Sequence, residues 1–156
     1  MTDFEIPAAT FAYLDRAASS LREAITSTDI GMRYAHAHVA ALRATAALLA
    51  ARARPAPVGS RRKPQRNAWV LLTEVAPEFT EWAMFFSAGA AKRAAAEAGS
   101  RRAVTEREAD DLVRDADRFL GLVEESLGLT RHLPVPARLP VHVPSHSEQL
   151  PVQRVG

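Results

Sequence analysis

The sequence predicts an all-α protein: an up-and-down bundle of four to five helices, followed by a Pro-rich tail that we expect to be disordered. Three observations predict this class. The 156 residues include 31 alanines but only 6% aromatic residues, and alanine fits a helix at low cost but packs poorly on a pleated sheet. Apolar residues recur at the i, i+3, i+4 spacing of helices. Proline and glycine divide the chain into blocks of helical length.

The first two helices are expected over residues 7–25 and from about residue 30 to Arg54. Ser27, Thr28 and Asp29 precede the second helix, and such side chains cap helix N-termini. Pro55 ends it because proline lacks the N–H that an interior position donates. The apolar stripe of the first helix is Phe11, Leu14, Ala18, Leu21 and Ile25, and that of the second is Met32, Ala35, Val39, Leu42, Ala46 and Leu49.

Three more helices follow a basic loop. Asn67 can cap a short helix over residues 68–76, and Pro77 begins a fourth helix that we expect to run unbroken to residue 98. Thr105 and Glu108 form a capping-box pattern before a fifth helix, which ends near residue 128. The fifth helix is expected to bury Leu112, Val113, Ala116, Phe119, Leu120 and Val123.

Two regions are therefore expected: a helical bundle over residues 7–128, with a basic loop at 52–66, and a flexible tail over residues 129–156. The tail has too few backbone donors and too little apolar mass to pack. Its prolines are Pro134, Pro136, Pro140, Pro144 and Pro151.

Several classes of chemistry are excluded by composition. The chain has no cysteine, so it has no disulfide, thiolate metal site or cysteine nucleophile, and it suits a reducing cytoplasm. It has no glycine-rich phosphate loop, and the first residues predict no signal peptide. No apolar run reaches the length of a membrane helix. The acids Glu74, Glu78 and Glu81 lack the histidines of a di-metal bundle, so we expect neither a metal nor another cofactor.

The positive charge of the protein is concentrated in one loop. The formal net charge is only +2, yet residues 52–66 hold six positive charges and no acid. Such a cluster can contact phosphates of RNA or of a nucleotide. The candidate binding residues are Arg52, Arg54, Arg61, Arg62, Lys63 and Arg66.

Arg33 and His38 fit an R-x4-H pattern near the start of the second helix. An imidazole can move a proton at a phosphodiester while a guanidinium stabilises its charged oxygens. His36 is the alternative base. On a helix the two side chains lie roughly 140° apart. We therefore expect a half-buried His38 at the edge of the apolar stripe and a solvent-exposed Arg33, so that the pair could converge only across a dimer.

The fourth expected helix is apolar on almost every side. Trp82 and Phe86 lie on its main stripe, and Met84 and Phe85 lie off it. A helix of this kind is either central to the core or shared with a partner. The helix that contains Trp82, Phe85 and Phe86 is therefore the predicted homodimer interface.

Whole helical blocks resemble a small actinobacterial family of stand-alone HEPN domains (higher eukaryotes and prokaryotes nucleotide-binding). The resemblance spans about residues 10–127 and is carried by YAHAHVAALRATAALLAARARP, EFTEWAMFFSAGAAKRAAAEAG and VTEREADDLVRDADRFLGLVE. It implies an up-and-down bundle that often dimerises. Many HEPN proteins are metal-independent ribonucleases with an R-x4–6-H motif, which only Arg33 and His38 match here, whereas others only bind nucleic acid or nucleotides.

Three functions stay open at this point. The first is a HEPN-like domain that binds RNA or a nucleotide, and the second is a metal-independent ribonuclease with Arg33 and His38 as catalytic residues. The third is a dimeric interaction module that presents the Pro-rich tail, whose spacing could suit an aromatic groove.

Overall fold

The central element of the fold is one long helix against which four other helices pack. The computed structural model describes residues 5–52 and 67–135. The central helix is α2 (Ile30–Arg52), and it contacts α1, α3, α5 and α6. The other elements are α1 (Ala8–Thr26), α3 (Ala68–Val75), the 3₁₀ turn η1 (Pro77–Phe79), α4 (Thr80–Ala88), α5 (Ala90–Glu97) and α6 (Glu106–Ser126).

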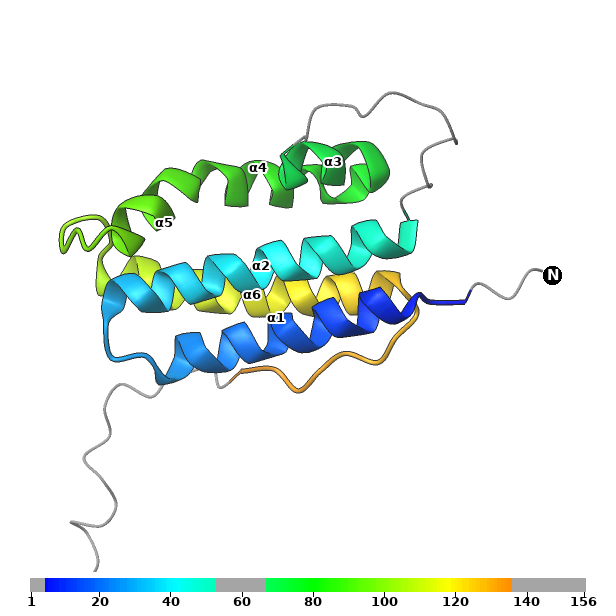
Figure 1. Cartoon of the computed structure of the whole chain (residues 1–156), viewed down its shortest axis with the longest axis horizontal. Helices are drawn as coiled ribbons and strands as arrows, with labels where there is room; N and C mark the ends of the chain where they lie inside the picture. Colours follow the sequence, from blue (N-terminus) through cyan, green and yellow to red (C-terminus); the bar gives the residue numbers. More distant parts are fainter. Residues whose placement is uncertain (1–4, 53–66, 136–156) are drawn as a thin grey trace, which may run out of the picture.

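The helices alternate in direction, as the sequence predicts for an up-and-down bundle. Helix α2 returns antiparallel to α1, the arm formed by α4 and α5 runs back over α2, and α6 closes the bundle (Figure 1). The all-α class is thereby confirmed. Within the described residues, none of the helices has the length and apolarity needed to cross a membrane.

The predicted helix ends are confirmed where a side chain caps them. The Asn67 side chain accepts a hydrogen bond from the Trp69 N–H, and Thr105 and Glu108 form the full capping box. The Asp29 carboxylate accepts from the Gly31 N–H at 2.9 Å. These contacts join residues two or three positions apart, so the local sequence is enough to specify them.

The fourth predicted helix is broken, contrary to expectation. It starts with η1 and is divided at Gly89 into α4 and α5. A Cβ added at Gly89 would lie 2.6 Å from the Tyr34 hydroxyl oxygen, so a larger residue would clash with α2. The interruption falls at a glycine whose missing side chain leaves room for Tyr34 of α2, a contact that a pattern within residues 77–98 does not reveal.

The apolar stripe expected for α2 is only partly correct. Of its six members only Ala35 is buried, while Tyr34, His38 and Leu48 are buried outside it. The reason is position: a helix with neighbours on several sides buries several faces and is not amphipathic. By contrast, α6 packs one apolar face against α1 and α2, and all six of its predicted core residues are buried.

Residues 129–135 lie along the bundle after α6 ends (Figure 1). Leu129 and Val135 pack against the core. This differs from the expectation of a free segment from residue 129 onward. The rest of the Pro-rich tail, residues 136–156, lies outside the described residues.

Candidate functional site

Arg33 is a partly buried anchor, whereas the sequence predicted a solvent-exposed side chain. Only 12% of its side chain is accessible, and its Nη1 lies 2.6 Å from Asp110 Oδ1. Its Nη2 also donates to the Ser27 carbonyl at 3.2 Å. The guanidinium can bury itself because each of these contacts satisfies its donors. Arg33 thus ties the α1–α2 turn to α6.

His38 is fully buried, whereas the sequence predicted a half-buried side chain. It is 1% exposed, and its Nε2–H donates to the Phe86 carbonyl at 2.8 Å. The ring meets Trp69 and Phe86 edge-on, with centroids 5.8 and 6.3 Å away. Burial lowers the pKa of His38, and neighbouring Arg93 acts in the same direction. The ring is therefore a neutral imidazole with the proton on Nε2.

Arg33 and His38 do not form a common site within one chain. Arg33 uses its donors on Asp110 and Ser27, and the Nδ1 of His38 lies 3.4 Å from Arg93 Nη1. The arginine beside His38 is therefore Arg93 of α5, which the sequence analysis did not single out. The alternative base, His36, lies on a more exposed side of α2 and pairs with Glu23 at 3.2 Å.

The basic residues of the loop are described at one position only. Arg52, at the end of α2, pairs with Glu78. The hydrogen bond from Arg52 lowers the pKa of the Glu78 carboxyl. Arg54, Arg61, Arg62, Lys63 and Arg66 lie outside the described residues.

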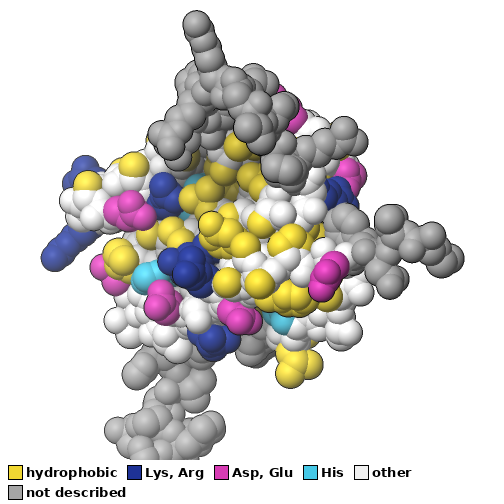
Figure 2. Space-filling model, turned by 45° about the vertical axis from the view of Figure 1, so that its right-hand side comes forward, with side chains coloured by type: hydrophobic (Ala, Val, Ile, Leu, Met, Phe, Trp, Pro, Cys, Tyr) yellow, Lys and Arg dark blue, Asp and Glu magenta, His cyan; other side chains and the backbone are white. Residues whose placement is uncertain are grey.

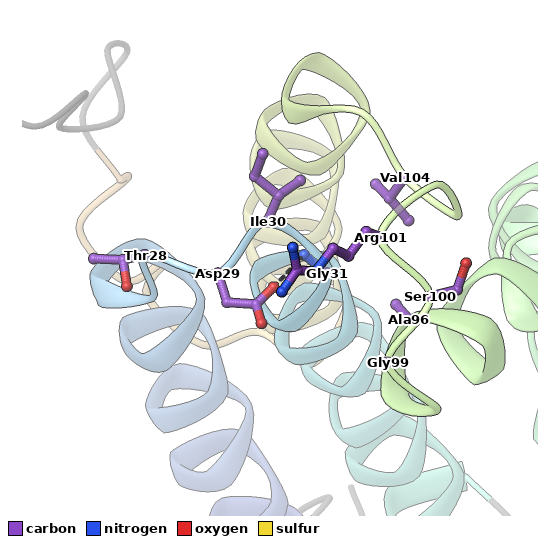
Figure 3. A pocket seen from close by; sticks show the side chains of 9 residues that line it. All are labelled: Thr28, Asp29, Ile30, Gly31, Ala96, Gly99, Ser100, Arg101 and Val104. Carbon is purple, nitrogen blue, oxygen red and sulfur yellow. Dashed lines mark hydrogen bonds between the residues drawn. The ribbon is translucent and has the colours of Figure 1, made fainter.

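A polar cavity of about 530 Å³ opens at the other end of α2, between the α1–α2 turn and the α5–α6 loop. The Arg101 side chain extends from that loop in the direction of Asp29 and Gly31 (Figure 3). Two hydroxyl residues, Thr28 and Ser100, also line it. The full lining is Thr28, Asp29, Ile30, Gly31, Ala96, Gly99, Ser100, Arg101 and Val104.

The charges of this cavity are incompletely paired. Among the described residues, Arg101 forms no ion pair, while Asp29 uses only Oδ1 in capping α2. The first turn of α2 adds the partial positive charge of a helix N-terminus. The sequence indicates Asp29 as a cap but gives no signal for Arg101, because only the tertiary packing of α5 on α2 places the two residues around one cavity.

A second, apolar groove of about 400 Å³ lies between α3 and α4. Hydrophobic side chains are spread over the middle of the face shown in Figure 2, with charged side chains among them. Val70 is 49% exposed, Met84 68% and Phe85 47%. Phe86 is fully buried, so it cannot form part of the predicted dimer interface, whereas Phe85 and Met84 can.

The fold and the comparison with protein families define the chain as a HEPN domain. A family model described as SAV_6107-like HEPN matches residues 24–124, well over half of the chain. The chain belongs to this family, and the family supports a nucleotide- or RNA-related role. The match includes every residue that lines the polar cavity. Comparison with curated proteins gives no significant match, and comparison with solved structures gives none either.

Proposed function

We propose that the protein binds a nucleotide, or a nucleotide unit of RNA, in the polar cavity at the start of α2. The observation that carries this proposal is that Arg101 has no ion-pair partner among the described residues. It shares the cavity with the Asp29 carboxylate, of which only Oδ1 accepts hydrogen bonds from the helix. A guanidinium is the side chain best suited to grip a phosphate, and a carboxylate can accept a hydrogen bond from a ribose hydroxyl. The volume of about 530 Å³ falls within the usual range of small-molecule sites.

Replacing Arg101 by serine should weaken binding of a fluorescent adenine nucleotide by about tenfold or more. The reason is the loss of a charge-assisted hydrogen bond, which is worth about 1.5–3 kcal/mol. Fluorescence anisotropy at low salt measures the dissociation constant. Arg107→Ser is the matched control because it removes the same charge from α6, where Arg107 is 92% exposed and pairs with Asp111.

Asp29→Asn removes the carboxylate charge of Asp29 but keeps its role as a helix cap, because asparagine caps helices as well as aspartate does. We expect this variant to keep its helix content and to lose affinity for ribose-containing ligands. Equal affinities for Arg101→Ser and Arg107→Ser would contradict the cavity as the binding site. Failure of the wild-type protein to bind at low salt would contradict the function itself.

We further propose that longer RNA also contacts the basic residues 52–66. In the sequence these residues begin with Arg52, the last residue of α2, whereas the cavity lies at the start of α2. A helix of 23 residues spans about 35 Å, so one nucleotide in the cavity cannot reach Arg52. Short single-stranded RNA should therefore bind more tightly, and with a steeper salt dependence, than a mononucleotide. A variant with serine in place of the loop arginines distinguishes binding in the cavity from binding at the loop, because it should lose only the added affinity for RNA. We also propose that the protein is located in the cytoplasm.

We also propose that a second copy of the chain covers the apolar groove between α3 and α4. The exposed side chains of Val70 and Met84, which both line this groove, favour it, because monomers rarely leave such residues adjacent and uncovered. Met84→Glu should convert a dimer into a monomer in analytical ultracentrifugation without loss of helix content. Phe11→Glu is the control, since Phe11 is also an exposed apolar residue but lies on α1. A wild-type protein that is monomeric at high concentration would refute this interface.

A further inference from the structure

The segment after α6 is held by one histidine between two carboxylates. The Nε2 of His132 bonds Asp117 Oδ1, and its Nδ1 bonds Glu124 Oε1. A neutral imidazole carries one N–H, so a ring with a carboxylate at each nitrogen is doubly protonated and charged. Asp117 and Glu124 are seven positions apart and lie on the same face of α6.

The backbone of the segment bonds the same two carboxylates. The His132 N–H donates to Glu124 Oε1 at 3.1 Å, and the Val135 N–H donates to Asp117 Oδ2 at 3.2 Å. Residues 132–135 therefore run antiparallel to α6, from Glu124 back toward Asp117. Both carboxylates are well shielded from water, with 10% and 13% of their side chains accessible.

Apart from these contacts, Leu129 and Val135 pack against the core at the two ends of the segment. Leu133 is 91% exposed, and Arg131 pairs with Glu125 at the surface. The aliphatic part of Arg131 lies over Gly121, whose added Cβ would be 3.5 Å from Arg131 Cδ. A cavity of about 250 Å³ remains between the segment and α6. Between Leu129 and Val135, polar contacts therefore hold the middle of the segment against α6.

We propose that residues 129–135 form a releasable strap, which a charged His132 closes over α6 and whose release uncovers the Asp117–Glu124 face. The strap lies beyond residues 24–124, which the family model matches. The charged groups nearest to His132 are Asp117 and Glu124. Arg118 lines the same cavity, and the Arg131–Glu125 pair lies beside it.

The strap should open as the pH rises. The hydrogen bonds that His132 donates to Asp117 and Glu124 raise the pKa of His132 from 6.5 to about 9. A raised folded-state pKa gives a stabilisation that is complete below pH 6.5 and declines as the pH approaches and passes about 9. At neutral pH the strap is therefore closed.

Limited proteolysis of the full chain with trypsin tests the strap, because the bond after Arg131 lies within it. The rate of cleavage after Arg131, divided by the rate after Arg138, cancels the pH dependence of trypsin itself. In His132→Gln this ratio should rise about tenfold at neutral pH, the equivalent of losing about 1.4 kcal/mol. In the wild-type protein the ratio should rise between about pH 7 and about pH 10.

His36→Gln is the matched control, since His36 pairs with one exposed carboxylate on α2, and its ratio should equal that of the wild type. Circular dichroism checks that the helices of each variant remain folded. A ratio for His132→Gln equal to that of the wild type overturns the strap. A wild-type ratio that stays constant as the pH rises overturns its dependence on the charge of His132.

Discussion

Replacing His38 by alanine should lower the free energy of unfolding by about 2–4 kcal/mol, the usual cost of emptying a large buried site. The ring is 1% exposed and packs edge-on against Trp69 and Phe86. Its loss also leaves Arg93 without its contact to Nδ1. Urea denaturation followed by circular dichroism measures the change.

His36→Ala is the matched control for this experiment. His36 lies two positions away on the same helix, with 30% of its side chain accessible, and its replacement should cost no more than about 0.5 kcal/mol. Equal losses at the two positions would show that the interior place of His38 contributes nothing to stability.

The direction of the pKa shift of His38 predicts how the stability of the wild-type protein and of His38→Ala depends on pH. Burial lowers the pKa of His38 below its usual 6.5. The unfolded chain therefore binds a proton that the folded chain resists, and stability falls as the pH drops below about 6.5. This part of the acid sensitivity should be missing in His38→Ala. His132 has the opposite sign, since its stabilisation is lost on the alkaline side.

Replacing Arg33 by alanine should cost about 1–3 kcal/mol, because it leaves a mostly buried carboxylate without its partner. Asp110 is 17% exposed, and Arg33 also holds the Ser27 carbonyl at the end of α1. A double-mutant cycle with Asp110→Ala should give a coupling energy of about 1–2 kcal/mol, with denaturation in urea as the measurement.

Arg107→Ala serves as the control for Arg33, because its side chain is 92% exposed and its ion pair joins residues on one helix. Such a pair contributes little, about 0.3–0.5 kcal/mol. A coupling energy near zero between Arg33 and Asp110 would contradict the anchoring role. It would also leave Arg33 free to act elsewhere, as the ribonuclease hypothesis requires.

The burial of His38 and Arg33 affects how the ribonuclease hypothesis can be tested. His38 has almost no accessible surface and Arg33 very little, and each one holds helices together. Loss of RNA cleavage in either variant would therefore carry information about catalysis only if the variant remains folded under the assay conditions. An EDTA-resistant cleavage assay should accordingly be run with the unfolding measurements on the same preparations.

The sequence predicted those features that neighbouring residues specify. The helix ends at Asn67 and Thr105 depend on side chains two or three positions from the backbone groups that they cap. The buried apolar face of α6 was predicted because this face packs against α1 and α2, so that its apolar residues follow the helical period. Alanine content and proline spacing likewise indicate helices without reference to any neighbour.

Tertiary structure decided the rest, because these features join residues far apart in the chain. Arg33 and Asp110 are 77 positions apart, and the Tyr34 hydroxyl that leaves no room for a side chain at Gly89 belongs to another helix. The composition of residues 129–135 predicts a free segment, yet two carboxylates on α6 hold it. The polar cavity has the same origin, since Asp29 and Arg101 line one cavity only because α5 packs on α2. The sequence by itself thus determined the helices and most of their ends, while the contacts between helices determined which polar side chains are buried and which can bind.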